Sequence, residues 1–374
     1  MIFVLSLILY RPDENQNNIL SGRKKMEKIR LGIVGFGFMG HCDADMMNTF
    51  GDIDLVAVAD TNPAQMEDAP EGVRTYAGID EMLADADINV VMVSTPNPSH
   101  PEMVKKAAAA KKHVICEKPA AMSVAEFDGM VAACKENGVL FTVHQQRRWD
   151  TDYRIMKEVY DKAMVGDMYI IKSQLYGFNG NMHDWHVFPE MGGGMLYDWG
   201  VHLIDQMLDM VHSEIVSLYA DVQNVINEKV DDYFKIIMKF KNGVTAEIEL
   251  GTYYLTPKRA WFIGGNKGSA IIDGFGGEGR IVRTAHLLEN VPGKITMTAA
   301  GPTRSFGPAA PGLLLEEELP KVNVSHRNYF EHFLKAFNGE EEIIVKPEQV
   351  RRVLCVMDAV RESARTGKAV IFEG

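Results

Sequence analysis

The sequence predicts an α/β protein in which a doubly wound parallel sheet comes first. An α+β domain with a large, mostly antiparallel open sheet then follows. From Lys28 to Val143, short apolar runs alternate with amphipathic helical patterns, which is typical of a parallel sheet covered by helices on both faces. From about residue 167 onward, longer segments alternate between polar and apolar residues, as antiparallel strands with one solvated face do.

Length and composition agree with this division. A chain of 374 residues is too long for one ordinary hydrophobic core, and 46% apolar with 24% charged residues is typical of a globular protein. The formal charge of −12 disfavours nucleic acid and anionic membrane surfaces as partners. The four cysteines are scattered without a CxxC pair, which predicts reduced thiols in a cytoplasmic protein.

The first 25 residues differ from the rest of the chain. An apolar run at 1–10 is too short to span a bilayer, and it lacks the basic start and the cleavage site of a secretory signal. The pattern from Met26 onward is that of a domain start. We therefore expect 1–25 to be a disordered extension or to precede the true start, 26–146 to form the first domain and 147–374 the second.

In the first domain, each expected strand is a nearly continuous apolar run, and each expected helix is amphipathic. The expected strands are 29–34, 55–59, 73–76, 89–94, 112–116 and 139–143. The expected helices are 38–49, 63–69, 79–85, 99–110 and 123–136. Right-handed crossovers place ligands at the carboxyl ends of such strands, so the loops after the strands should surround a bound molecule.

The second domain is expected to open with a helix at 151–163. Alternating segments predict strands at 167–178, 214–226, 231–240 and 243–252. Helical patterns are found at 195–211, after a triple glycine, and near 326–337 and 347–365. The segment 273–312 is rich in Gly, Pro and Ala, which predicts loops or an irregular hairpin.

Residues 35–40 read Gly-Phe-Gly-Phe-Met-Gly directly after the first expected strand. In a dinucleotide-binding turn, Gly35 permits the tight turn, Gly37 lets the backbone approach a pyrophosphate, and Gly40 allows close packing of helix on strand. The helix that begins near Phe38 directs its free N–H groups and its positive end at the phosphates. The pattern therefore predicts a Rossmann domain that binds a dinucleotide.

An acidic residue stands at the expected distance from this turn. Asp60 ends the second strand, where its carboxylate can accept hydrogen bonds from both hydroxyls of an adenosine ribose. The same carboxylate should repel a 2′-phosphate, and Thr61-Asn62-Pro63 supplies no arginine to bind one. We therefore predict NAD as the cofactor, with NADP disfavoured.

The loop after the fifth strand reads Cys116-Glu-Lys-Pro-Ala120. An ammonium group at Lys118 would lie close to the nicotinamide, where it can hydrogen-bond a substrate hydroxyl and stabilise a developing alkoxide. Glu117 can accept hydrogen bonds from the nicotinamide ribose. Alternatively, the segment is only a polar turn in which the proline sets a cis bond or a helix start.

The helix at 195–211 carries Asp198 and His202 four residues apart, so the two side chains should share one face. A carboxylate beside an imidazole can orient the ring and raise its basicity, as a general base requires. The alternative is an exposed pair that only stabilises the helix. The preceding glycines and the aromatic neighbours Tyr197 and Trp199 favour a shaped cleft wall.

Other polar residues lie near the expected carboxyl edge of the sheet. In the segment from Thr95 to His100, Ser99 can cap the next helix while neighbouring side chains contact the cofactor. Arg147 and Arg148 either meet substrate or cofactor, or pair with acids. His183-Asp-Trp-His186 lacks the three or four converging ligands of a metal site, so no metal is predicted.

Taken together, these motifs resemble those of the glucose–fructose oxidoreductase / inositol dehydrogenase / MocA family, from about Glu27 to the C-terminus. The matching elements are Gly35-x-Gly37-x-x-Gly40, Asp60, Thr95-Pro-Asn-x-x-His100, Glu117-Lys-Pro119 and Gly193-Gly-x-Leu-x-Asp198-x-Gly-x-His202. The resemblance implies a C-terminal domain whose open sheet forms homodimers or homotetramers. It also implies a catalytic trio of Lys118, Asp198 and His202.

In that trio, His202 would take the hydroxyl proton of a secondary alcohol while NAD accepts the hydride, Asp198 would orient His202 or the substrate, and Lys118 would polarise the reacting oxygen. The residues predicted to contact the cofactor are Gly35, Phe36, Gly37, Phe38, Met39, Gly40, Asp60, Thr61, Thr95, Asn97, His100, Glu117, Lys118 and Gln146. Those predicted to contact the substrate are Lys118, Arg148, Trp185, His186, Asp198 and His202.

The leading functional hypothesis is an NAD-dependent dehydrogenase that oxidises a secondary ring hydroxyl of a sugar, glycoside or cyclitol, with C3 as one candidate position. Trp185, His186, Tyr197 and Trp199 are candidate walls for the apolar C–H faces of such a ring. Two alternatives stay open. One is an NAD-dependent glycosidase that oxidises its substrate transiently, and the other is a non-catalytic NAD- or sugar-binding regulator.

Overall fold

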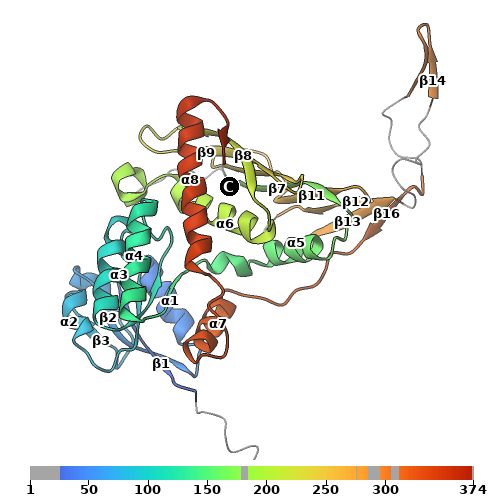
Figure 1. The fold of residues 1–374 in the computed structure, drawn as a ribbon. Helices are drawn as coiled ribbons and strands as arrows, with labels where there is room; N and C mark the ends of the chain where they lie inside the picture. Colours follow the sequence, from blue (N-terminus) through green and yellow to red (C-terminus); the bar gives the residue numbers. More distant parts are fainter. Residues whose placement is uncertain (1–25, 178–183, 275, 285–294, 305–310, 373–374) are drawn as a thin grey trace, which may run out of the picture.

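The computed structural model describes residues 26–177, 184–274, 276–284, 295–304 and 311–372. The expectation about residues 1–25 therefore lies outside the described part, as do His183 and parts of the Gly/Pro-rich segment. Figure 1 shows two sheets, each with helices packed against it. The fold class predicted from the sequence is therefore confirmed.

The first sheet has six parallel strands in the order β3-β2-β1-β4-β5-β6, which is the doubly wound Rossmann order. Its strands are β1 (Ile29–Val34), β2 (Ile53–Ala59), β3 (Arg74–Tyr76), β4 (Val90–Val93), β5 (His113–Cys116) and β6 (Phe141–Val143). Its helices are α1 (Phe38–Met47), α2 (Ile79–Leu83), α3 (His100–Ala109) and α4 (Val124–Asn137). All four residues of β4 are buried, as continuous apolar strands of a covered sheet should be.

One expected helix of this domain is much shorter than predicted. Only Pro63–Met66 is helical, as a 3₁₀ turn in which the Ala64 N–H donates to the side-chain oxygen of Asn62. None of its residues is buried. With only partly buried side chains such as Met66 packed on the core, a short helix gains too little to propagate.

The second sheet has nine strands in the order β16-β13-β12-β11-β7-β10-β9-β8-β17. Its pairs are antiparallel except for β7 with β10. The strands are β7 (Met168–Tyr176), β8 (Ile215–Gln223), β9 (Tyr233–Phe240), β10 (Thr245–Gly251), β11 (Trp261–Gly265), β12 (Gly268–Ile272), β13 (Gly279–Thr284), β16 (Leu314–Glu317) and β17 (Val370–Ile371). Strands β11 and β12 were not predicted, because each is short and carries glycines that weaken the alternating pattern.

The Gly/Pro-rich segment contributes strand β13 to this sheet and, among its described residues, a separate hairpin of β14 (Ile295–Thr298) and β15 (Gly301–Arg304). The helices of this half are α5 (Thr151–Asp161), α6 (Val201–Met210), α7 (Arg327–Phe337) and α8 (Pro347–Thr366). Helix α8 packs on β8 and α6, whereas α7 lies beside the first domain (Figure 1). There the ring of Phe330 contacts Phe50.

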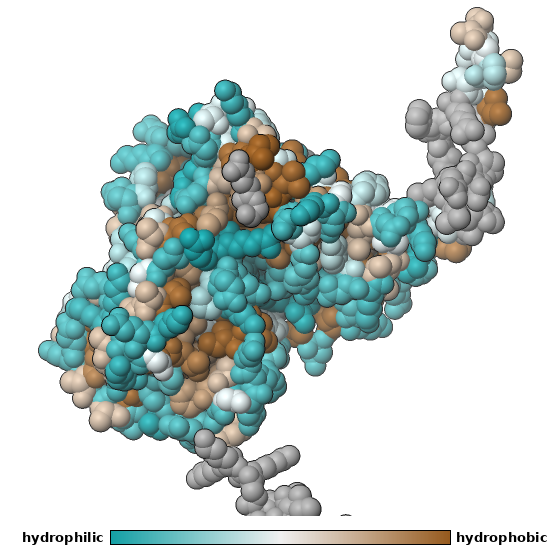
Figure 2. Space-filling model, viewed as in Figure 1, coloured by the Kyte–Doolittle hydropathy of each residue, from teal (hydrophilic) through white to brown (hydrophobic). Residues whose placement is uncertain are grey.

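The surface in the same view is mostly hydrophilic with separate apolar patches (Figure 2). One patch lies beside the C-terminal end of the chain, where Val216 and Tyr219 of β8 and Ile371 of the edge strand β17 are exposed. Among the described residues, no helix combines the length and apolar content that a bilayer-spanning segment needs.

Candidate active site

The glycine turn has the geometry that a dinucleotide requires. Gly35 has a φ of +87°, and a Cβ atom there would lie 2.6 Å from the backbone of Ser94. A Cβ atom at Gly40 would lie 2.5 Å from the carbonyl oxygen of Gly35. At Gly37, by contrast, no atom lies within 4 Å of the Cβ position, so the start of helix α1 faces open space. The turn therefore fits a phosphate group that approaches the backbone.

Asp60 lies beside this turn at the carboxyl end of β2. Its Oδ2 accepts the Phe36 N–H at 2.8 Å, and its Oδ1 accepts the Asn62 N–H at 2.8 Å. Each carboxylate oxygen keeps a lone pair for a ribose hydroxyl. The neighbouring Thr61 and, at 83% exposure, Phe38 are open to solvent, so a ligand can reach this edge.

The loop after β4 is tied to other parts of the protein through Asn97 and His100. The buried ring of His100 lies with Nε2 2.7 Å from the Thr95 carbonyl oxygen and Nδ1 3.0 Å from that of Pro119. Asn97 donates to the carbonyl oxygen of Met191 at 3.1 Å. These partners show that the two side chains join loops together, while their contact with the cofactor stays a prediction.

Ser99 does not cap helix α3 with its side chain. Its hydroxyl donates to the Thr95 hydroxyl at 2.7 Å and lies equally close to the Pro96 carbonyl oxygen. The expectation that the Ser99 side chain caps this helix is therefore wrong. The hydroxyl instead turns back into its own loop.

Lys118 and Asp198 connect the two halves of the chain. Lys118 follows strand β5 and precedes a cis peptide bond to Pro119. Its Nζ donates to Asp198 Oδ1 at 2.8 Å and to the Asp198 carbonyl oxygen at 3.0 Å. The Lys118 side chain is only 14% exposed, so this ion pair is partly shielded from water.

The partner of His202 is Gln145, whereas sequence analysis expected Asp198. Nδ1 of His202 lies 3.1 Å from Gln145 Oε1. The α-helical spacing assumed for Asp198 and His202 does not apply, because Leu196–Gly200 is a π-helical turn that precedes α6. The widened turn leaves Asp198 paired with Lys118 instead.

His202 is held in its neutral form. Burial lowers its pKa well below the usual value, and the positive charges of Lys118 and Arg147 lower it further. With the amide oxygen of Gln145 as its partner, Nδ1 carries the ring proton. Nε2 then keeps its lone pair and can accept a proton.

The π-helical turn is anchored by Asp231, a residue that sequence analysis did not single out. Asp231 Oδ2 accepts the Leu196 N–H at 2.7 Å, and its backbone oxygen accepts the Met195 N–H. A Cβ atom at Gly194, where φ is +98°, would lie 2.3 Å from Asp231 Oδ1. The triple glycine thus lets the carboxylate reach the start of the helix.

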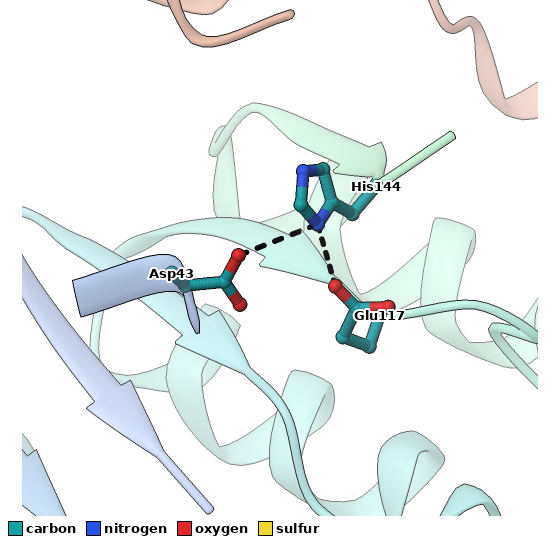
Figure 3. A group of neighbouring side chains, drawn as sticks. All are labelled: Asp43, Glu117 and His144. Atoms are coloured by element: carbon teal, nitrogen blue, oxygen red, sulfur yellow. Dashed lines mark hydrogen bonds and ion pairs between the residues drawn. The ribbon is translucent and has the colours of Figure 1, made fainter. Parts of the chain in front are cut away.

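Glu117 belongs to a buried group with Asp43 and His144, and Figure 3 shows the three side chains converging. Glu117 Oε1 lies 2.5 Å from His144 Nδ1, and Glu117 Oε2 accepts the Lys118 N–H at 3.1 Å. Asp43 Oδ1 lies 3.8 Å from the same imidazole nitrogen. Asp43 gave no sequence signal, since it is one polar residue within a helix, whereas the position of His144 directly after β6 marks it as a candidate.

The ligand atoms of Asp43, Glu117 and His144 lie within 4.8 Å of one another, so the group could be taken for a metal site. The 2.5 Å between His144 Nδ1 and Glu117 Oε1 is a hydrogen-bonding distance. Two ligands of one ion, each about 2 Å from it, lie roughly 3 Å apart. The geometry therefore indicates a shared proton, and the prediction of no metal stays a prediction.

Gln146 and Arg148 follow in the 3₁₀ turn Gln146–Trp149. Gln146 is buried, and its Oε1 has no partner among the described residues. Arg148 Nε and Nη2 donate to Asp205 at 2.7 and 2.6 Å, and Nη1 donates to Gln349 at 3.0 Å. The structure therefore places Arg148 in a buried ion pair with Asp205 that joins this turn to α6, and its hydrogen bond to Gln349 joins the turn to α8.

The substitution Arg148→Met should destabilise the protein, because it leaves the buried Asp205 carboxylate without its cation. We expect a loss of roughly 3 kcal/mol in the free energy of unfolding, measured by chemical denaturation. Arg365→Met, which removes an exposed arginine of α8, is the matched control and should change little. Unchanged stability in Arg148→Met, with a raised KM, would instead support the predicted contact with substrate.

Trp185 and His186 are stacked on each other with ring centroids 3.8 Å apart. The His186 carbonyl oxygen accepts the Gly194 N–H at 3.1 Å, so their segment packs on the triple glycine. Trp199 lies edge-on to His202 at 6.2 Å, and the Arg147 guanidinium lies 4.0 Å from the Trp199 ring. Trp199 thus lies directly beside the candidate base.

Two family models match consecutive parts of the chain. The model described as the oxidoreductase family with an NAD-binding Rossmann fold matches residues 29–145, and the GFO/IDH/MocA C-terminal domain matches residues 153–271. The chain belongs to the GFO/IDH/MocA oxidoreductase family. This confirms the resemblance inferred from the motifs and the prediction of an NAD-binding Rossmann domain.

Similar proteins cover most of the chain. The solved structure of an NAD-binding protein from Listeria innocua is 33% identical, covers 92% of this chain and 100% of its own, and superposes with a TM-score of 0.86. The scyllo-inositol 2-dehydrogenase (NADP(+)) of Bacillus subtilis is 23% identical over 95% of this chain and 99% of its own length. An uncharacterized oxidoreductase of Schizosaccharomyces pombe is 32% identical, but its match spans only 49% of this chain and 50% of that protein.

Proposed function

We propose that this oxidoreductase uses NAD to oxidise a secondary ring hydroxyl of a sugar, glycoside or cyclitol. The observation that carries the proposal is the meeting of Lys118, Asp198 and His202 where the Rossmann domain touches the second half of the chain. The positive charge of Lys118 lowers the pKa of His202. His202 is buried, and the Lys118 side chain is only 14% exposed. The similarity to an inositol dehydrogenase supports a polyol as the substrate.

Each member of the trio has a distinct role in this proposal. His202 Nε2 accepts the proton of the reacting hydroxyl, since burial keeps the ring in its basic form. The Lys118 ammonium donates a hydrogen bond to the same oxygen and stabilises the negative charge that develops there. Asp198 holds the ammonium in place. Bound NAD supplies the hydride acceptor.

The surrounding residues fit a sugar ring. Trp199, beside His202, offers an aromatic face for the C–H groups of the ring. Trp185 and His186, whose segment packs on the triple glycine, are the further candidates for such contacts. The contact of Arg148 with substrate stays a prediction. The N–H groups of its guanidinium already donate to Asp205 and Gln349. The candidate position of oxidation, C3 of the sugar ring, rests on the family resemblance.

The test is a screen for NADH formation, followed at 340 nm, with inositols, free sugars and aryl glycosides as substrates. We expect at least one polyol to yield NADH stoichiometrically. Aglycone release without net NADH would support the glycosidase alternative. NAD binding without turnover of any compound would support the regulator.

Asp60→Ala should weaken NAD binding and relax the rejection of NADP, because the carboxylate both binds the ribose and repels a 2′-phosphate. We expect the ratio of Kd for NADP to Kd for NAD to fall about tenfold, which corresponds to the loss of one charged hydrogen bond. Asp54→Ala, an exposed aspartate of the same strand, is the control. If Asp60→Ala keeps the full preference for NAD, the ribose is recognised by other residues.

The protein is further proposed to act in the cytoplasm as a homodimer or homotetramer. The described cysteines are all free, as in a reducing compartment. Exposed apolar side chains on the second sheet, such as Tyr169, Val216 and Tyr219, support an interface between copies of the chain. Light scattering of the purified protein tests the oligomer, and a monomer at micromolar concentration would contradict it.

A further inference from the structure

We propose that Asp43, Glu117 and His144 form a buried proton-holding triad whose charge sets how strongly the cofactor site prefers oxidised to reduced nicotinamide. The inference rests on the proposed function and on the predicted position of Glu117, which directly precedes Lys118, beside the cofactor. It adds Asp43 and His144 as residues that position Glu117 and determine its charge. Neither of the two was predicted to contact cofactor or substrate.

The three side chains are buried together, and two of their polar atoms lack a hydrogen-bond partner among the described residues. His144 Nδ1 lies 2.5 Å from Glu117 Oε1 and 3.8 Å from Asp43 Oδ1, and the three side chains are at most 5% exposed. Asp43 Oδ2 and His144 Nε2 have no hydrogen-bond partner among the described residues. Buried polar atoms without partners are rare and costly, so a place for a further proton exists here.

The charges favour one protonation state near neutral pH. Burial would lower the pKa of His144, but the charge of Glu117 and their hydrogen bond raise it, and the same contact keeps the pKa of Glu117 below its usual value despite burial. Burial raises the pKa of Asp43 to about 8; the positive charge of His144 opposes this rise, and the negative charge of Glu117 adds to it. The triad therefore holds a Glu117–His144 ion pair and a protonated Asp43, with no net charge.

Several other groups lie near Asp43 but do not belong to the triad. Burial raises the pKa of Cys116 and of Tyr329 on α7 well above neutral, and burial also raises that of Cys42 on α1 itself. Lys118 is held in its ion pair with Asp198. Ser94, at the end of β4, is uncharged. The step near pH 8 is therefore assigned to the triad, in which Asp43 is the group whose pKa burial raises to about 8.

A charge at the triad acts differently on the two cofactor forms. Nicotinamide carries a positive ring charge when oxidised and none when reduced. As pH rises through 8, Asp43 loses its proton and the triad gains one negative charge, which favours the positively charged form. In a medium of effective dielectric constant about 20, two unit charges roughly 10 Å apart interact strongly enough to change an affinity on the order of tenfold.

The experiment measures the dissociation constants of NAD⁺ and NADH for the full chain between pH 6 and 9, by calorimetry without substrate. We expect the ratio of Kd for NADH to Kd for NAD⁺ to rise about tenfold across this range. In Asp43→Asn, which keeps the shape and cannot ionise, the ratio should stay at its low-pH value. Asp45→Asn, an exposed aspartate of the same helix, should keep the step.

A second readout needs no variant. Because linkage is reciprocal, NAD⁺ binding near pH 8 should release protons, which calorimetry in buffers of different ionisation enthalpy detects. A ratio that does not change with pH in the unmodified protein, or a step that survives in Asp43→Asn, would overturn the inference. If neither cofactor form binds at all, the proposed function fails instead.

Discussion

Replacing Lys118 by alanine should lower kcat/KM for the polyol substrate by about a thousandfold, the magnitude typical of losing a charged group that stabilises a developing oxyanion. The Lys118 ammonium is a partly shielded cation held 2.8 Å from Asp198 beside the neutral His202. Cofactor affinity should change little, since the glycine turn and Asp60 remain. Steady-state kinetics together with the dissociation constant of NAD measure both quantities.

The pH profile of this variant is a second check on the role of Lys118. The positive charge of Lys118 lowers the pKa of His202, so its removal should raise that pKa. The residual activity should then require a higher pH, with the acid limb of the profile shifted upward. Lys106→Ala, which removes a surface lysine paired with Asp80 and Glu102, should leave rate and profile unchanged. Full activity of Lys118→Ala would remove Lys118 from the mechanism.

His202→Gln should lower kcat by about 10²- to 10⁴-fold, the usual contribution of a general base. Glutamine keeps a polar side chain near Gln145 but cannot accept the proton at neutral pH. The fold should persist, because protonation of this buried ring is already unfavourable and the neutral form is the one replaced. Stopped-flow measurement of NADH formation isolates the chemical step from product release.

The matched control for His202→Gln is His212→Gln, since His212 is exposed just after the end of the same helix. That control should retain full activity. Should His202→Gln turn over as fast as the unmodified protein, another group takes the proton, and Lys118 would be the first candidate to test.

The elements predicted best are those set by local sequence. Strand β1 matches its predicted range of 29–34, because a continuous apolar run leads directly into the glycine turn. The predicted helix at 63–69 is only a 3₁₀ turn, and none of the residues of that turn is fully buried. Local pattern thus predicts where elements lie, and packing decides how long they become.

The candidate site was predictable only in part, for a similar reason. Lys118 and His202 follow from motif and position, but their partners depend on which elements the fold brings together. Asp231 reaches the π-helical turn from the loop before β9, and Gln145 reaches His202 from just after β6. Such contacts leave no periodic signal in the sequence.

The most direct test of the central claim is the fate of the carbon-bound hydrogen of a polyol found in the screen. The substrate is labelled with deuterium at the reacting carbon and incubated with NAD, and both products are analysed by mass spectrometry. We predict one deuterium in the reduced cofactor for each ketone formed. Deuterium that stays in a cleaved sugar, with no labelled NADH accumulating, would contradict the dehydrogenase proposed here.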